Sequence, residues 1–123
     1  MDLVALSEKA MSLRRRFDDA AKEAGGRPWT REEVMQGFVG DVGDLTKLVM
    51  AKSGIREIGE ADTKLAHELA DCLWSVLVLA NLYGVDLEKE FLIMIEAVTQ
   101  KLGHYSKKRG ANRHSQRAGN QRG

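Results

Sequence analysis

The longest apolar stretch of the sequence covers residues 72–82, and it constrains the fold more than any other feature. Only Ser75 and Asn81 interrupt it, and on a helix it would be apolar on nearly all sides as far as Tyr83. Such a helix belongs at the centre of a packed structure, and it is too short to span a bilayer. A chain of 123 residues does not readily enclose a central helix. We therefore expect no membrane insertion, and a homodimer or a dimer of dimers with isologous contacts.

The rest of the chain also has helical periodicity. Apolar residues recur near every 3.6 positions, there is one proline, and β-branched runs are rare. The pattern predicts helices over about residues 2–24, 30–52, 62–83 and 87–102. The predicted fold class is all-α, a four-helix bundle completed by homo-oligomerisation.

Local signals set the helix starts. Thr30 and Glu33 have the spacing of a capping box, and Asp62 or Thr63 is expected to cap the third helix. Trp29 is expected to pack on the first turn of the second helix, with stacking on a nucleobase as the alternative. Trp74 is expected in the core.

The composition changes sharply near the C-terminus. Residues 1–100 hold 12 Lys/Arg and 18 Asp/Glu, whereas residues 101–123 hold seven Lys/Arg and no acid. No apolar residue larger than alanine follows Tyr105. We therefore expect a helical domain over residues 1–103 and a basic, disordered tail over residues 104–123. If the chain binds nucleic acid, the tail is the part expected to bind it.

Two features predict a cytoplasmic protein. The N-terminal residues include Asp2 and Glu8 and lack the pattern of a signal peptide. The single cysteine, Cys72, has no disulfide partner within the chain and is expected to act as a small buried hydrophobe.

Two pairs of acids are the main chemical signal. Asp41 and Asp44 on the second helix, and Glu68 and Asp71 on the third, each have the i, i+3 spacing that places two side chains on one helix face. His67 is expected to point to another side of the third helix and to be structural. Four neighbouring carboxylates repel one another, and a hard divalent cation such as Mg²⁺ would offset that repulsion. Solvated surface acids are the alternative.

Asp41 also falls at the edge of an apolar stripe, where an unpaired carboxylate is costly. On the second helix, the stripe that is predicted to face the protein core consists of Val34, Phe38, Val42, Leu45 and Val49.

Three segments resemble the MazG family of all-α nucleoside triphosphate pyrophosphohydrolases, in particular its dCTPase-like branch. They are FVGDVGDL at residues 38–45, HELADCL at 67–73 and LANLYGVDL at 79–87. The resemblance covers roughly residues 30–90, with aspartates where the family has the two glutamates of the first segment. It implies Mg²⁺-dependent hydrolysis of a nucleoside triphosphate to the monophosphate and pyrophosphate, in removal of surplus or damaged nucleotides, with Mn²⁺ as a possible substitute.

The resemblance also implies roles for individual residues. Metal ligands would be Asp41, Asp44, Glu68 and Asp71, with Asp41 and Glu68 also in catalysis. Independently of the resemblance, Lys52 could reach a phosphate, and Asn81 is a candidate for contacts to a base or a sugar because a buried amide needs partners. Lys101 is a third candidate for contacts to the nucleotide, at a basic position of the family pattern.

One part of the family pattern is missing. The family usually has a lysine and, four residues later, an asparagine near the phosphates. Counted without gaps from Asp86, these positions are Met94 and Val98. Two alternatives therefore stay open: a non-catalytic nucleotide or metal sensor, and a helical interaction module whose basic tail binds nucleic acid.

Overall fold

The structure, a computed structural model, describes residues 1–119, with the side chains of residues 105, 106 and 111–119 left out. Across these residues it contains four helices and no strand. The helices are α1 (Leu3–Glu23), α2 (Arg31–Lys52), α3 (Ala61–Leu82) and α4 (Leu87–Gly119). The predicted all-α class is confirmed. The chain forms two compact units, of which the first ends at Asp86 and the second contains α4.

Helices α1 and α2 begin at side-chain caps. Asp2 accepts a hydrogen bond from the backbone N–H of Ala5 at 2.9 Å. Thr30 and Glu33 form the predicted capping box in both directions. Glu33 also accepts a hydrogen bond from Arg27, which, together with the Thr30 N–H, holds the pKa of Glu33 below its usual range.

Helix α3 begins differently from the prediction. Neither Asp62 nor Thr63 caps it: Glu60 is the N-cap residue, with φ 57° and ψ 38°, and its side chain makes no capping hydrogen bond. Asp62 lies inside the first turn, where its charge favours the positive end of the helix dipole. There it forms an ion pair with Lys52 at the end of α2.

The ends of α2 and α3 share one hydrogen-bond pattern. Each has a glycine in the left-handed region directly after the C-cap, Gly54 with φ 78° and Gly84 with φ 66°. After α3, the Gly84 N–H donates to the carbonyl of Asn81 at 3.2 Å and the Val85 N–H to that of Ala80 at 2.8 Å. These bonds satisfy the last carbonyls of the helix within the chain itself.

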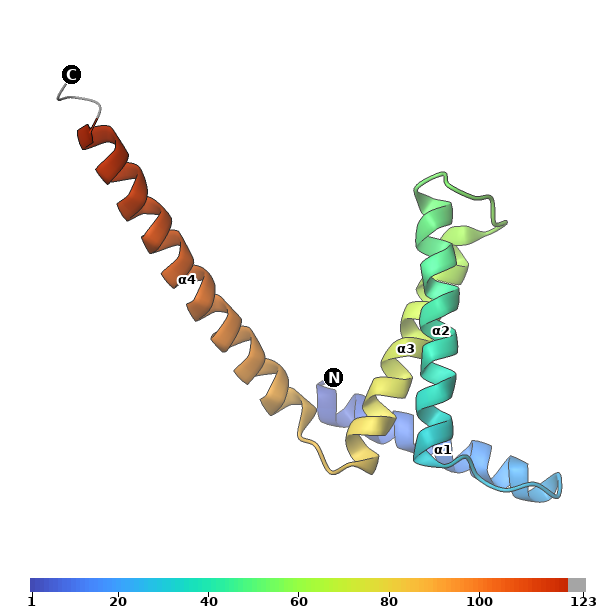
Figure 1. Cartoon of the computed structure of the whole chain (residues 1–123). Helices are drawn as coiled ribbons and strands as arrows, with labels where there is room; N and C mark the ends of the chain where they lie inside the picture. Colours follow the sequence, from blue (N-terminus) through green and yellow to red (C-terminus); the bar gives the residue numbers. More distant parts are fainter. Residues whose placement is uncertain (120–123) are drawn as a thin grey trace. The chain divides into compact units, whose positions relative to one another are not determined.

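Helices α2 and α3 lie side by side as an antiparallel hairpin (Figure 1). The buried residues of the hairpin are Val34, Leu48, Ser75, Leu77 and Val78. The predicted core stripe of α2 is wrong at two positions, because Val42 and Val49 are exposed. Half-buried Asp41 and Leu45 lie between the buried ends of the stripe instead. A carboxylate therefore faces the helix–helix contact.

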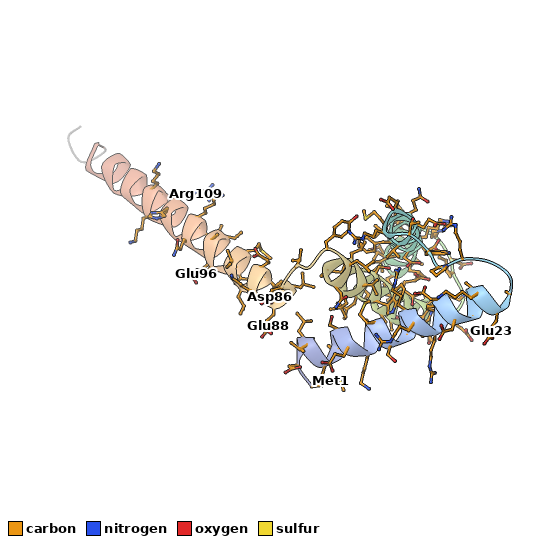
Figure 2. The ribbon with its side chains drawn as sticks, turned by 90° about the horizontal axis from the view of Figure 1, so that it is seen from below. Met1, Glu23, Asp86, Glu88, Glu96 and Arg109 are labelled. Atoms are coloured by element: carbon orange, nitrogen blue, oxygen red, sulfur yellow. The ribbon has the colours of Figure 1, made fainter. Side chains whose placement is uncertain are left out.

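Helix α1 packs on α3 through aromatic side chains. The indole N–H of Trp74 donates to the carbonyl of Ala10 at 3.1 Å, and the ring of Phe17 meets that of Trp74 edge to face at 5.9 Å. Arg14 donates from α1 to the carbonyl of Trp29 at 3.0 Å. Figure 2 shows α1 from Met1 to Glu23 beside the hairpin. Trp74 thus has the expected core role.

Replacing Trp74 with phenylalanine should destabilise the α1–α3 contact. The variant loses the hydrogen bond to Ala10 and part of the ring surface that meets Phe17. We expect the free energy of unfolding to fall by about 1–3 kcal/mol. Urea unfolding followed by circular dichroism measures it, and an unchanged midpoint would show that this contact does not hold α1 in place.

Trp29 precedes α2, and its ring packs against Gly37, beyond the first turn of that helix. A Cβ atom at Gly37 would come within 2.8 Å of a carbon of the Trp29 ring, so the ring occupies the space that the glycine leaves. The side chain of Trp29 is still 55% exposed. The prediction that Trp29 packs on α2 is therefore correct, but the contact lies about one turn further along the helix than predicted.

Helix α4 continues past Leu102, its predicted end, to Gly119. Every side chain described from Glu88 onward is exposed, including Phe91, Ile95, Leu102 and the basic Lys107 and Lys108. Figure 2 shows side chains projecting from the helix as far as Arg109. The boundary at residue 103 and the nucleic-acid-binding tail stay predictions.

Helix α3 is long and apolar enough to cross a membrane when judged by length and composition alone. The core helix of a soluble protein passes the same test. Here α3 carries Glu68 and Asp71 and packs against both α1 and α2. The absence of membrane insertion stays a prediction.

Candidate metal centre

Three of the four predicted metal ligands meet in the α2–α3 hairpin. Asp41 and Asp44 come from adjacent turns of α2, and Glu68 comes from α3 opposite them. One carboxylate oxygen from each lies within 4.8 Å of the other two. The i, i+3 spacing on α2 and the antiparallel packing of α3 bring them together. The three side chains thus form a cluster of hard oxygen ligands, the type that Mg²⁺ and Mn²⁺ prefer.

Glu68 has the least satisfied side chain of the cluster. Its Oε2 atom is buried, and it has no hydrogen-bond partner among the described residues. Burial raises the pKa of Glu68, and the charges of Asp71, Asp41 and Asp44 raise it further. A buried carboxylate oxygen without a partner is unfavourable unless a proton or a cation meets it. The structure therefore fits a divalent cation at this position.

Asp41, which faces Glu68 from the other helix of the hairpin, has a similar environment. Burial raises its pKa, and the negative charges of Asp71 and Asp44 add to that effect. The cluster therefore resists holding all its negative charges at once. A bound divalent cation would reverse this balance, because its own charge would become the largest in the site.

Asp71 lies beside the cluster and outside it. Its Oδ2 atom is 3.3 Å from the Nε2 atom of His67, one turn earlier on α3. The prediction that His67 points elsewhere is wrong, since the i, i+4 spacing makes the two side chains neighbours. Asp71 still acts on the cluster through its charge, which raises the pKa values of Asp41 and Glu68.

The lysines of α2 differ in their distance from the cluster. Lys47 approaches Asp44, with the two charged atoms 3.8 Å apart. Lys52 lies two turns beyond Asp44, about 12 Å along the helix, and is paired with Asp62. The structure therefore places Lys47 near the cluster and gives Lys52 a different partner.

The remaining predicted contacts to the nucleotide are not brought to the cluster within the first unit. Asn81 is exposed, so the argument that a buried amide needs a ligand does not apply to it. It lies about 15 Å along α3 from Asp71. Lys101 belongs to α4 in the second unit.

Cys72 is a neighbour of the cluster that the sequence did not assign to it. Burial raises the pKa of the Cys72 thiol, and the charges of Asp41, Glu68 and Asp71 add to that effect. The thiol is therefore kept protonated. The i, i+4 spacing from Glu68 was the signal that could have placed it here.

Comparison with families of known proteins supports the same part of the chain. Residues 29–109 match the MazG nucleotide pyrophosphohydrolase domain. The chain belongs to the MazG family. The match includes α2, α3 and the first part of α4, and so all three acids of the cluster. Neither the curated proteins nor the solved structures gave a match.

Membership of the MazG family supports a pyrophosphohydrolase type of hydrolase at the level of the family. The dCTPase-like branch and the individual site residues stay predictions. Met94 and Val98 lie inside the matched region and are exposed on α4. This member of the MazG family therefore has apolar side chains at these two positions.

Proposed function

We propose that this MazG protein hydrolyses a nucleoside triphosphate to the monophosphate and pyrophosphate, with Mg²⁺ or Mn²⁺, in the cytoplasm. The observation that carries the proposal is the buried, unpartnered Oε2 atom of Glu68 inside a cluster of three carboxylates. Buried acids of this kind are typical of sites where a cation and a reacting group meet. Removal of surplus or damaged nucleotides is the corresponding cellular role.

Each acid has a part in the proposed reaction. Asp41, Asp44 and Glu68 would hold the cation, which when bound supplies positive charge for the triphosphate oxygens and the leaving pyrophosphate. Glu68 would also take the proton of the attacking water, through the buried Oε2 atom that has no hydrogen-bond partner among the described residues. Asp71, held by His67, would orient the site and supply a further ligand.

The phosphate contacts would come from lysines. Lys47 lies beside the cluster, with its Nζ atom 3.8 Å from a carboxylate oxygen of Asp44. Lys52 and Lys101 are further candidates, and either could contact the substrate only if the substrate extends beyond the acidic cluster. Asn81 would contact the base or the sugar.

A second candidate is a sensor that binds nucleotide and metal without turnover. It is favoured by Met94 and Val98, which stand where the resemblance implies a lysine and an asparagine for the phosphates. The sensor predicts stabilisation by nucleotide and Mg²⁺ together, with no product.

The deciding experiment is pyrophosphate release from a panel of canonical and modified (d)NTPs. The reaction is run with Mg²⁺, with Mn²⁺ and with EDTA, and the Asp44→Asn variant is measured beside the wild type. Release that needs the metal and disappears in the variant supports the enzyme and names its substrate. No release from any nucleotide, together with a metal-dependent rise in Tm, would contradict the enzyme and support the sensor instead.

A further inference from the structure

The composition of helix α4 changes at Gly103. Before this residue, large apolar side chains such as Phe91 and Leu102 occur together with acids such as Glu96. After it, the helix contains no acid and, apart from Tyr105, no apolar residue larger than alanine. Residues 103–119 are called the basic segment below. Its lysines and arginines are Lys107, Lys108, Arg109, Arg113 and Arg117.

The basic segment is exposed wherever its side chains are described. Lys107, Lys108 and Arg109 follow one another in the chain, and all three are exposed. The backbone is helical as far as Gly119. A helix over residues 103–119 is about 25 Å long. The segment is therefore a positively charged helix of about that length.

The residues of the basic segment do not favour a helix by themselves. Gly103 and Gly110 lie inside the helix, and glycine is among the weakest helix formers. Arginines at positions 109, 113 and 117 are one turn apart, and like charges at this spacing destabilise a helix. A ligand with many negative charges would offset that repulsion. Such a ligand would stabilise the helical form by binding to it.

The composition of the segment favours a nucleic acid over a membrane surface as this ligand. A helix that lies on a membrane buries a face of large apolar side chains, and the segment has only Tyr105. Polar side chains accompany the basic ones instead. Together with lysine and arginine, side chains of these types bind phosphate oxygens and base edges. They are Ser106, Asn112, His114, Ser115 and Gln116.

The helical form of the segment favours duplex DNA among the nucleic acids. An α-helix is about 10–12 Å across, and the major groove of B-DNA, about 12 Å wide, admits it. The major groove of duplex RNA is too narrow for side chains to read. A helix of about 25 Å corresponds to about seven base pairs at 3.4 Å each.

The charge of the remaining chain limits DNA to this part of the molecule. Residues 1–100 hold 12 Lys/Arg and 18 Asp/Glu, so their net charge is negative. Phosphates are therefore repelled by the rest of the chain and attracted by the basic segment.

We propose that the basic segment of α4 binds double-stranded DNA, with its helix in the major groove. Lys107, Lys108 and Arg109 pair with phosphates, which gives affinity without sequence preference. This inference concerns α4 alone. It does not depend on the hydrolysis of nucleotides, so either can fail without the other.

The first test measures binding of the full chain to a short, fluorescently labelled DNA duplex of mixed sequence. Anisotropy is followed between about 50 and 200 mM salt, where phosphate contacts weaken steeply. The triple variant Lys107→Ala, Lys108→Ala, Arg109→Ala should bind on the order of 100-fold more weakly near 100 mM salt. The slope of log K against log salt should become shallower by about 3. The matched control Lys9→Ala, Arg15→Ala, Arg16→Ala removes three exposed charges from α1 and should bind as the wild type does.

A second pair of variants tests the helix itself. Gly110→Pro keeps every charge but breaks the helix within the basic segment, so it should bind DNA several-fold more weakly. Gly110→Ala is its control. Nothing lies within 4 Å of a Cβ atom added at Gly110, and alanine favours the helix, so this variant should bind at least as tightly as the wild type.

Duplex RNA, single-stranded DNA and vesicles that contain phosphatidylserine are measured beside the DNA duplex. Tighter binding to any of the three would overturn the proposal, in favour of that ligand. So would a wild type that does not bind the DNA duplex at the lowest salt, or an equal loss of binding in the α1 control. Wild-type affinity of the triple variant would remove the basic segment from the contact, and wild-type affinity of Gly110→Pro would exclude a helix in the groove.

Discussion

The Glu68→Gln variant should lose pyrophosphate release by at least about 100-fold, while its fold is kept. Glutamine has nearly the same shape but no negative charge, and it cannot take a proton from water. The variant therefore loses a charged metal ligand and the proposed base together, and several kcal/mol of charge stabilisation correspond to two or more powers of ten in rate. The buried Oε2 position would be filled by an amide group.

The measurement is kcat at saturating substrate and saturating Mg²⁺, so that weaker metal binding is separated from slower chemistry. Glu8→Gln, which changes an exposed acid on α1, is the matched control and should keep the wild-type rate. Circular dichroism checks the fold of both variants. Turnover by Glu68→Gln at the wild-type rate would remove Glu68 from the site.

The Asp41→Asn variant should be more stable than the wild type without metal and should no longer be stabilised by Mg²⁺. Burial and the charges of Asp71 and Asp44 raise the pKa of Asp41, and Glu68 is raised in the same way. The folded state therefore binds more protons than the unfolded state between the usual carboxyl range and the raised values. Stability of the metal-free protein must then fall as pH rises through that window.

Thermal unfolding in EDTA across pH 4–8 tests the sign of this dependence, and a titration with Mg²⁺ at pH 7 tests the metal. Free Mg²⁺ at 100 times its Kd would stabilise the wild type by about 2.7 kcal/mol. The variant should show a weaker fall of Tm with pH and little response to Mg²⁺. If the wild type shows no response to Mg²⁺ or Mn²⁺, these acids are ordinary surface charges.

Local signals in the sequence were sufficient for the helices and for part of the site. The capping box of Thr30 depends on neighbouring residues alone, and it was predicted correctly. The i, i+3 pair on α2 likewise needs only helix geometry. The meeting of Asp41 and Asp44 with Glu68 followed from pairing two neighbouring helices.

The errors come from contacts between helices, which no local pattern specifies. Val42 and Val49 match the helical period as well as Asp41 does, and only the direction of α3 decides which side is buried. Lys52, which stays a candidate for contacts to the nucleotide, forms an ion pair with Asp62 across the hairpin turn, and no local pattern predicts that pairing. The helix end predicted at Leu102 was also wrong, because a segment without large apolar residues gives no periodic pattern to follow as far as Gly119.

The hydrogen bonds that end α3 have a consequence for the order of folding. Because the Gly84 and Val85 N–H groups satisfy the last carbonyls of the helix, no later residue is needed to finish it. Helices α2 and α3 are also consecutive in the chain and pack directly on each other, which favours rapid folding. Completion of the hairpin and its three acids therefore requires no hydrogen bond from α4.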